Sequence, residues 1–393
     1  MTKRDDKRVP ALRFKGFTDE WEQRKLKNLV DFYSGLTYHP ENIREKGTFV
    51  IRSSNIKDGQ LVTGDNIFVA PEIVNSTYVK KDDIIVVVRN GSRKLIGKHT
   101  KLNFNLNNAV IGAFMTGIRS NNNNFINAIF DSDNFKREIH KNLGATINQI
   151  TTGELKRMNF YIPSLTSEQN YLGNLMKVLD KLITLQQRKL TELQLLRTSL
   201  NQQLLKDNSS WKSVKLREIL NIRNKQIFPN QQYPLMSFVQ KQGVVPKSQR
   251  YNRDFLVKGN KKYKVTEKGD FIYSSNNLET GSIGINKTGN ATISPVYSVF
   301  SSKNYKESLF IGLLSEKKSF IYKMIRFRQG VVYGQWKIPE KDFLNIKIKI
   351  PNYQEQEKII TLFTHIDNQF KQENKKLTDL QNFKQFLLQN MFI

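Results

Sequence analysis

An internal repeat is the feature that most constrains how this chain can fold. Residues 189–194, KLTELQ, return 187 positions later as KLTDLQ at residues 376–381, with one carboxylate exchanged for the other. A second match relates WEQRKL at residues 21–26 to WKSVKL at residues 211–216 through the shared Trp, Lys and Leu. This period is far longer than the ~20–50 residues of solenoid repeats. The repeat therefore predicts two comparable domains, each followed by a long helix, and two comparable binding events.

The charge of the chain points to a polyanionic partner. The 393 residues leave room for two or more domains, and 38% hydrophobic residues with 25 Phe argue against disorder. There are 63 basic and 35 acidic side chains, for a formal charge of +28. A field this positive favours nucleic acid first and an anionic membrane surface second. A merely soluble basic protein is the remaining alternative.

Several classes of protein are excluded by what the sequence lacks. The chain has no cysteine, which excludes disulfides, thiolate metal sites and a cysteine nucleophile. No apolar run approaches the ~18 residues needed to span a bilayer. The first eight residues, MTKRDDKR, are too polar for a signal peptide. We therefore expect a cytoplasmic protein without a membrane partner.

The repeat and the changes of hydrophobic period divide the chain into five segments. β-rich runs such as residues 84–88 mark the globular parts, and a helical period begins near Pro163. The predicted segments are an N-terminal arm at 1–16, globular domains at 17–163 and 209–351, and spacer helices at 164–208 and 352–393. The fold class is α+β, with two mixed α/β domains.

The two spacer segments have the pattern of a coiled coil. In the first, apolar residues recur in a 4-3 rhythm that includes Leu172, Met176 and Leu179. Thr166 and Gln169 can form a capping box just after Pro163. About 40 helical residues would make a rod roughly 60 Å long. The second segment repeats the rhythm.

Polar residues interrupt each apolar seam at equivalent positions. Gln186 and Arg197 in the first helix correspond to Glu373 and Lys384 in the second. Setting one copy antiparallel to the other pairs Arg197 with Glu373 and Gln186 with Lys384, while apolar residues face apolar residues elsewhere. Because polar residues within a seam specify register, these four residues predict an intramolecular antiparallel coiled coil. The alternatives are two helices packed on their own globules, or an intermolecular coil.

Motifs for catalysis are absent from the sequence. There is no P-loop, no G-x-G-x-x-G and no H-E-x-x-H. The four histidines lack metal-ligand spacing, and Asp82-Asp83 before a hydrophobic strand is typical of a turn. The chain also lacks the Pro-Pro of the Asn/Asp-Pro-Pro-aromatic loop of DNA methyltransferases. We therefore predict no catalytic residues and no metal site, and a recognition subunit rather than an enzyme.

Two motifs carry a resemblance to a known family. VPALRF at residues 9–14 leads into GFTDEWE at residues 16–22. An Ile-Pro pair followed by Glu-Gln and then by Leu/Ile-Asp occurs twice, at residues 162–180 and again at residues 350–367. This order, over the whole chain, resembles the specificity subunits of Type I restriction–modification enzymes.

The resemblance implies a non-catalytic DNA-binding role. In this family each globule is a target recognition domain that reads one half of a bipartite DNA site. The two domains stand in a pseudo-two-fold arrangement, and the coiled coil sets the half-site spacing. The implied partners are double-stranded DNA, two methyltransferase subunits and restriction/translocase subunits. No cofactor is expected on this chain. S-adenosylmethionine is expected on the methyltransferase subunits, which methylate adenine, and ATP and Mg on the restriction subunits.

Polar loops that follow or precede predicted strands are the candidates for DNA contact, because Lys and Arg suit phosphates while Arg, Lys, amides and hydroxyls suit bases. In the first domain they are Arg89, Asn90, Ser92, Arg93, Lys94, Lys98, Asn148 and Gln149, and Lys101 extends the charge. In the second they are Ser274, Ser275, Asn276, Asn277, Arg326, Arg328, Gln329, Tyr333, Gln335 and Lys337. If both groups read DNA, their dissimilarity predicts an asymmetric site. Solvated loops without a ligand are the alternative.

Two rival functions remain open from the sequence. One is a basic two-domain scaffold whose helices hold protein partners and which binds nucleic acid without sequence preference. The other is a nuclease or methyltransferase that acts alone.

Overall fold

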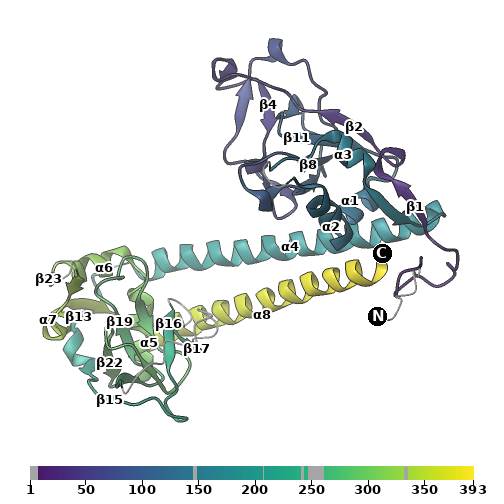
Figure 1. Cartoon of the computed structure of the whole chain (residues 1–393). Helices are drawn as coiled ribbons and strands as arrows, with labels where there is room; N and C mark the ends of the chain where they lie inside the picture. The colour runs from purple at the N-terminus through teal and green to yellow at the C-terminus, as the bar shows by residue number, and fades with distance from the viewer. Residues whose placement is uncertain (1–7, 145–147, 207, 240–242, 247–260, 332–334) are drawn as a thin grey trace. The chain divides into compact units, whose positions relative to one another are not determined.

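The computed structural model describes residues 8–144, 148–206, 208–239, 243–246, 261–331 and 335–393. The chain divides into two compact units. Unit 1 comprises Met1–Lys189 and Glu373–Ile393, and unit 2 comprises Leu190–Gln372. The two long helices α4 (Thr166–Leu204) and α8 (Tyr353–Met391) therefore each contribute one part to unit 1 and the other to unit 2 (Figure 1).

Unit 1 is a mixed α/β domain built on two four-stranded sheets and two two-stranded ribbons, β1–β12 and β5–β6. Its strands are β1 Glu22–Lys25, β2 Asp31–Ser34, β3 Ile43–Arg44, β4 Thr48–Ile51, β5 Ile56–Lys57, β6 Gln60–Leu61, β7 Ile67–Val69, β8 Ile84–Val87, β9 His99–Lys101, β10 Ala109–Ile111, β11 Met115–Arg119 and β12 Asn159–Ile162. Its short helices are α1 Asn123–Asp131, α2 Asp133–Asn142 and α3 Thr152–Arg157. The sheets have the orders β2-β11-β8-β9 and β10-β4-β7-β3, and β1 pairs with β12.

Both faces of strand β8 are covered by apolar cores. Ile84 and Val86 belong to the core beneath α1 and α2, whereas Ile85 and Val87 belong to a second core against β4 and β10. Successive side chains of a strand point to opposite faces, so a strand covered on both faces needs an unbroken run of apolar residues. The buried strand predicted at residues 84–88 is confirmed.

Unit 2 repeats this plan. Its strands are β13 Lys212–Lys215, β14 Leu220–Ile222, β15 Gln226–Ile227, β16 Met236–Val239, β17 Gly243–Pro246, β18 Tyr263–Thr266, β19 Phe271–Tyr273, β20 Ile283–Ile285, β21 Ala291–Ile293, β22 Ser298–Ser302, β23 Gln329–Val331, β24 Gln335–Lys337 and β25 Lys347–Ile350. Its short helices are α5 Tyr305–Leu314, α6 Lys318–Ile325 and α7 Glu340–Asn345. The central strand β19 lies between β22 and β20, and β13 pairs with β25 as β1 pairs with β12. Phe271 and Tyr273 face one core while Ile272 faces another. The predicted fold class, two mixed α/β domains with long helices, is confirmed.

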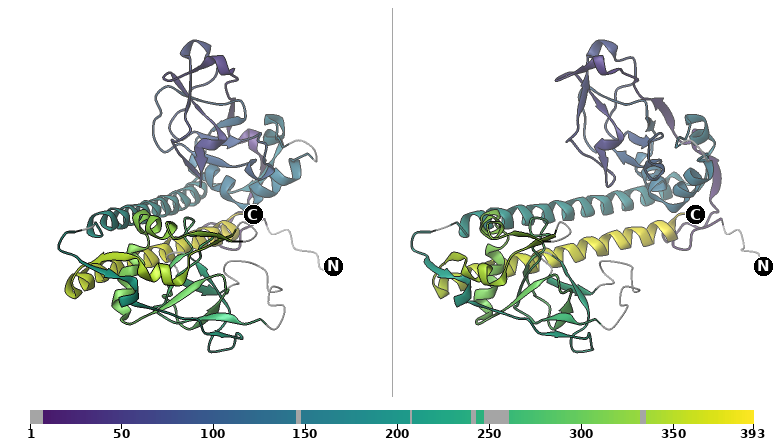
Figure 2. Two further views of the ribbon diagram at one scale, coloured as in Figure 1. Left: turned by 90° about the vertical axis from the view of Figure 1, so that its left-hand side faces the viewer. Right: turned by 60° about the vertical axis from the view of Figure 1, so that its left-hand side comes forward.

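Within each unit, parts of α4 and α8 pack antiparallel and join the core of the globule. In unit 1, Leu172 and Met176 of α4 share a buried cluster with Leu387 and Met391 of α8. Figure 2 shows the end of α8 lying beside the start of α4 in this unit. Hydrogen bonds join Asp180 of α4 to Lys384 of α8, and Gln186 of α4 to Glu373 of α8. The later residue of α4 thus bonds to the earlier residue of α8, so the two helices run in opposite directions. The predicted intramolecular pair is therefore confirmed within unit 1.

The predicted register of the helix pair is wrong. Gln186, expected opposite Lys384, donates its side-chain amide to the carboxylate and the backbone carbonyl of Glu373, at 2.6 and 2.8 Å. Lys384 bonds instead to Asp180, six residues earlier in α4. Arg197, expected opposite Glu373, bonds to Asp367, also six residues earlier. A seam with a seven-residue period matches almost equally well after a slip of about one heptad, so apolar spacing alone could not select the register.

Candidate nucleic-acid interface

In unit 1 the two predicted groups of DNA-contact residues meet beside the end of β8. Arg89 forms an isolated antiparallel bridge with Gln149. The backbone N–H of Asn90 donates to the carbonyl of Asn148 at 3.2 Å, and the side-chain amide of Asn148 donates to the carbonyl of Gly91 at 3.0 Å. The fold thus brings residues about 60 apart in the sequence into one surface.

Two residues that the sequence did not single out support this loop. The side-chain amide of Asn90 donates to Ser53 Oγ at 2.9 Å. The guanidinium of Arg89 lies 5.0 Å from the ring centre of Phe114, whose side chain is 52% exposed. Neither Ser53 nor Phe114 belongs to a recognisable motif, because both reach the loop only through the tertiary fold. An exposed aromatic ring beside an arginine can also stack on a base.

The cationic side chains in and near this loop differ in their exposure to solvent. Arg93 and Lys94 open the short helix η5 (Arg93–Leu95) with exposed side chains. Ser92 is exposed as well, and Lys98 is half-buried. Lys101, by contrast, has a side chain that is only 8% exposed and bonds to Asp82 and Asn124 at 2.8 and 2.9 Å. It therefore holds α1 and the turn before β8 together rather than extending the exposed charge.

In unit 2 the loop after β19 is anchored by two of the predicted contact residues. Ser274 and Ser275 are both buried, and Ser275 Oγ accepts the backbone N–H of Ile338 at 3.0 Å. As placed, these serines hold the loop and do not face a partner. Asn276 and Asn277 are exposed, and Asn276 Oδ1 accepts the backbone N–H of Trp336 at 2.6 Å.

The hairpin β23–β24 supplies the other group in unit 2. Arg328 donates to the backbone carbonyl of Ser275 at 2.9 Å and pairs with both carboxylate oxygens of Glu279 at 2.6 and 2.7 Å. Its guanidinium also lies 5.5 Å from the ring centre of Trp336, which is 48% exposed and was not predicted. These contacts anchor the start of the hairpin to the loop after β19 through Arg328.

The remaining predicted residues of this group are placed as follows. Arg326, Gln329, Gln335 and Lys337 are exposed. Tyr333 lies outside the described residues.

The two surfaces are equivalent in position and different in chemistry. In each unit, the loop after the central strand is hydrogen-bonded to the segment that leads into the next short helix, α3 or α7. The exposed side chains of the unit-1 loop are mainly cationic, at Arg89, Arg93 and Lys94. In unit 2 the loop after β19 exposes the amides Asn276 and Asn277, and the exposed cations Arg326 and Lys337 lie outside that loop. Since hydrogen-bonding side chains discriminate between base edges, surfaces that differ in this way suit different sequences.

Comparison with known proteins decides the family. A family model for the Type I restriction modification DNA specificity domain matches residues 18–195 and again residues 208–382. This chain belongs to that family. Each half therefore carries one DNA specificity domain, in agreement with the repeat. The family is defined by DNA specificity rather than catalysis, and both the resemblance and the prediction of a non-enzyme are confirmed.

Named relatives agree with this assignment. The Type I restriction enzyme StySPI specificity subunit of Salmonella potsdam is 29% identical over 161 residues, which cover 38% of this chain and 34% of that protein. The EcoKI specificity subunit of Escherichia coli (strain K12) is 26% identical over 160 residues, with the same coverage. The aligned stretch thus spans about a third of each curated relative. The crystal structure of a Type-I restriction-modification system S subunit from M. genitalium shares the fold, with a TM-score of 0.66 at 16% identity over 98% of this chain and 99% of that one.

Each DNA specificity domain holds a buried acid immediately before its central strand. Asp83 accepts two bonds from Arg119, at 2.8 and 2.9 Å, and one from the Tyr33 hydroxyl at 2.7 Å. Burial and the bond to Asp83 raise the pKa of Tyr33 far above its usual range. Asp270, 187 residues after Asp83, pairs in the same way with Arg223. Asp83 also accepts the backbone N–H of Lys80, so the turn predicted at residues 82–83 is confirmed.

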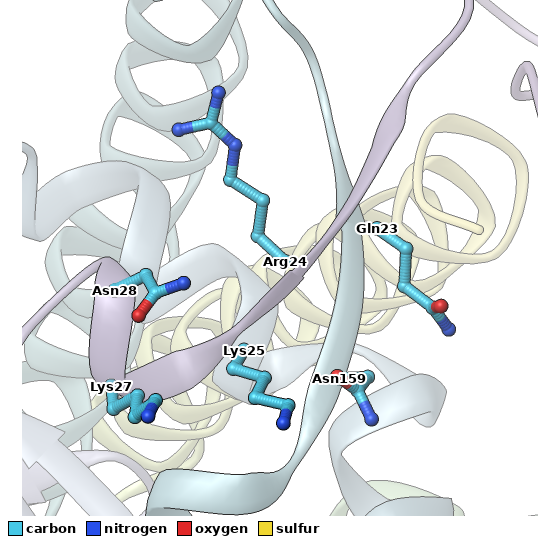
Figure 3. Close-up of a pocket in the computed structure, with 6 residues that line it drawn as sticks. All are labelled: Gln23, Arg24, Lys25, Lys27, Asn28 and Asn159. Carbon is cyan, nitrogen blue, oxygen red and sulfur yellow. The ribbon is translucent and has the colours of Figure 1, made fainter.

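The first specificity domain carries a second basic surface, which the sequence did not predict. A hollow of about 620 Å³ lies over the β1–β12 ribbon and η1 (Leu26–Asn28). It is lined by Gln23, Arg24, Lys25, Lys27, Asn28 and Asn159 (Figure 3). Lys25 and Asn159 are cross-strand partners, and Lys215 and Lys347 form the equivalent pair in unit 2. Cationic and amide groups of this kind can contact phosphate oxygens.

The described residues form neither a metal site nor a membrane-spanning helix. There, no cluster of three or more His, Asp or Glu side chains is arranged to hold a metal ion. Over the same residues, none of the helices combines the length and the apolar character needed to cross a membrane.

Proposed function

We propose that this chain is the non-catalytic specificity subunit of a Type I restriction–modification complex, and that each specificity domain reads one half of a bipartite, asymmetric DNA site. One observation carries the proposal: in both units, the loop after the central strand is hydrogen-bonded to a second polar segment and forms one surface with it. This surface exposes Arg93 and Lys94 in unit 1 and Asn276 and Asn277 in unit 2. The cations suit phosphates and the amides suit base edges. The net charge of +28 supports a DNA partner.

The spacing of the half-sites is proposed to follow from the two long helices. α4 and α8 have 39 residues each, and each contributes to both units. A helix of that length spans roughly 60 Å. The unread base pairs between the half-sites are then determined by helix length, and the helix pair acts as a ruler.

The partners are proposed to be two methyltransferase subunits, which bind S-adenosylmethionine and methylate adenine, with restriction/translocase subunits that use ATP and Mg. An exposed apolar stripe on the unit-1 part of α4 supports protein docking. It consists of Tyr171, Val178, Leu182 and Leu185, with side chains 44–58% exposed. Spacings of seven, four and three residues place these side chains on one helical face. Exposed apolar stripes of this kind commonly mark interaction surfaces.

The decisive experiment is methylome sequencing of cells that express the chain with a cognate methyltransferase, against cells that lack the chain. We expect adenine methylation at one bipartite motif only when the chain is present. Methylation by the chain alone would contradict the non-catalytic assignment. DNA binding with a steep salt dependence but no sequence preference would instead support a non-specific scaffold.

A further inference from the structure

Each unit contains a basic side chain held between two acids. In unit 1, Lys384 donates to Asp180 Oδ1 at 2.5 Å and to Asp131 Oδ2 at 2.6 Å. We call Lys384, Asp131 and Asp180 the unit-1 clasp. Its cation comes from α8, and its acids come from α4 and from the end of α1. The clasp therefore joins both long helices to the globule.

Unit 2 contains the equivalent group with the two helices exchanged. Arg197 donates to Asp367 Oδ1 at 2.6 Å and to both carboxylate oxygens of Glu316 at 2.6 and 2.9 Å. We call Arg197, Glu316 and Asp367 the unit-2 clasp. Here the cation comes from α4, one acid from α8, and the other from the turn after α5. Asp180 and Asp367, like Arg197 and Lys384, are 187 residues apart, so the repeat preserves the clasp.

The cations of both clasps are largely shielded from water, and each clasp has a further partner beside one of its acids. The side chains of Lys384 and Arg197 are 14% and 15% exposed. His99 Nε2 lies 3.1 Å from Asp131 Oδ1, and Lys287 lies 3.3 Å from Asp367. Burial opposes ionisation of Asp131, but the bonds to His99 and Lys384 outweigh it and hold its pKa below the usual range. A charge in such a site needs its partners in one geometry, because an unpaired buried charge is costly.

The apolar contacts around the clasps do not by themselves define one arrangement. Hydrophobic contact is non-directional, and a helix seam with a seven-residue period allows slips by whole heptads. Charge-assisted hydrogen bonds are directional, and the paired bonds between Arg197 and Glu316 require one orientation of both side chains. The clasps are thus directional contacts that distinguish one seating of the globule on the helices from its neighbours. Neutral bonds such as those of Asn122 to Asn170 and Asn124 to Asn174 add to them at exposed positions.

We propose that the two clasps are positioning elements that set the register and angle at which each DNA specificity domain sits on its part of the helix pair, and thereby determine the spacing of the two half-sites. This inference rests on the proposed function for its link to half-sites. Its structural part, the seating of the globule on the helices, can be tested without DNA or partners.

The structural test uses a distance distribution in the purified full-length chain. Because the chain has no cysteine, His140→Cys on α2 and Lys375→Cys on α8 can be spin-labelled selectively. Both positions are exposed and lie in unit 1. We expect one narrow distance peak in the parent. Asp131→Asn should broaden or split it, because Asn keeps the shape of Asp but removes the charge.

Matched variants separate seating from general loss of stability. Glu138→Gln removes a charge from the α1–α2 hairpin, where Glu138 pairs along its own helix with Lys141, and it should leave the peak unchanged. The double variant Asp131→Glu/Lys384→Arg copies the residue types of the unit-2 clasp and should retain a single peak. An unchanged peak in a folded Asp131→Asn protein overturns the proposal. If that variant fails to fold, a split peak in the folded double variant overturns it.

The functional test is the methylome of Asp131→Asn and Glu316→Gln. Methylation at the parental motif should fall about tenfold relative to motifs that have the same half-sites and a spacer one base pair longer or shorter, the factor expected for a modest loss of preference. Unaltered spacer preference in both variants, with an altered distance distribution in Asp131→Asn, would refute the link to half-sites. If the parent chain directs no methylation at all, the proposed function fails, and the distance measurement still decides the seating.

Discussion

At the scale of single residues, Arg13 explains part of the N-terminal signature. Its guanidinium forms paired bonds with both carboxylate oxygens of Glu168, at 2.7 and 2.8 Å. Glu168 lies in the first turn of α4, where the helix dipole favours an anion, and its side chain is 1% exposed. The hydrogen bond that Arg13 donates to Glu168 raises the pKa of Arg13 against the effect of burial. The arm is thus tied to the start of the spacer helix.

Arg13→Ala should leave the buried carboxylate of Glu168 without its ionic partner. We expect a loss of about 3–5 kcal/mol in the free energy of unfolding of unit 1, measured by denaturant titration at pH 7. Arg13→Ala/Glu168→Gln leaves no buried charge and should recover part of that loss. A change below about 0.5 kcal/mol in the single variant, the range of an exposed pair, would show that Glu168 is solvated in solution.

The exposed cations of the unit-1 loop should contribute to affinity through phosphates. Arg93→Ala/Lys94→Ala is expected to lower the slope of log K against log[salt] by about 2, since each phosphate contact contributes about 0.9. The slope is measured by titrating the motif DNA at several salt concentrations. Lys375→Ala, an exposed cation of α8, serves as the control, and an equal effect there would indicate only a general field.

At the scale of elements, both long helices begin in the same way. The side-chain amide of Gln169 donates to the carbonyl of Pro163 at 2.9 Å, and that of Gln356 donates to Pro351 at the same distance. This explains why Gln follows Glu after each Ile-Pro pair. Farther along, Glu373 of α8 receives bonds from Gln186 and Lys189 of α4 and from its helical neighbour Lys376.

Glu373 should make the helix pair sensitive to acid. Bonds from Gln186, Lys189 and Lys376 lower its pKa from 4.5 to about 2. A carboxylate with a lowered folded-state pKa stabilises the fold above its unfolded pKa, and this contribution is lost as pH falls through the folded value. Glu373→Gln should therefore be less stable than the parent at pH 7, with a difference that shrinks between pH 4.5 and about 2. A pH-independent difference in thermal unfolding would argue against an ionic contribution.

The apolar stripe on α4 should carry partner docking. Leu182→Ser/Leu185→Ser removes two exposed leucines without disturbing the buried seam. Burial of a leucine contributes about 1.5–3 kcal/mol, so the affinity for the methyltransferase subunit should fall roughly a hundredfold or more. Titration calorimetry with the purified subunits measures this. Lys181→Ser, at a neighbouring exposed position, should have little effect, and intact affinity in the double variant would move the docking surface elsewhere.

At the scale of the whole molecule, the repeat allows both helices to be shortened together. Residues 187–193 of α4 and 374–380 of α8 are equivalent in the repeat, and in each helix they lie between the two clasp residues. Removing one heptad from both preserves the apolar period. It should bring one domain closer by roughly 10 Å, or about three base pairs at ~3.4 Å each. Methylome sequencing should show the same half-sites with a shorter spacer, and an unchanged spacer would refute the ruler.

The sequence predicted which loops form the candidate interface. It did not predict correctly which side chains these loops expose. Residues 89–94 and 148–149 were expected to contact DNA and do form one surface, because each is a polar run next to a buried strand. Phe114 and Trp336 were missed, since a single aromatic residue has no local pattern that marks it as exposed. Ser274 and Ser275 are polar, like their exposed neighbours in the sequence, yet both are buried. Ser275 accepts a hydrogen bond from Ile338, the residue after β24.

The sequence by itself determined the duplication, the long helices, the buried central strands and the exclusion of disulfides, because each of these depends on residue counts or on local periodicity. Only the tertiary structure decided the helix register and the partners of Arg197 and Lys384. A seven-residue period is unchanged by a slip of one heptad, so local spacing could not choose between registers. The acids Asp131 and Glu316 choose one of them, and they lie 253 and 119 residues from the cations that they bind.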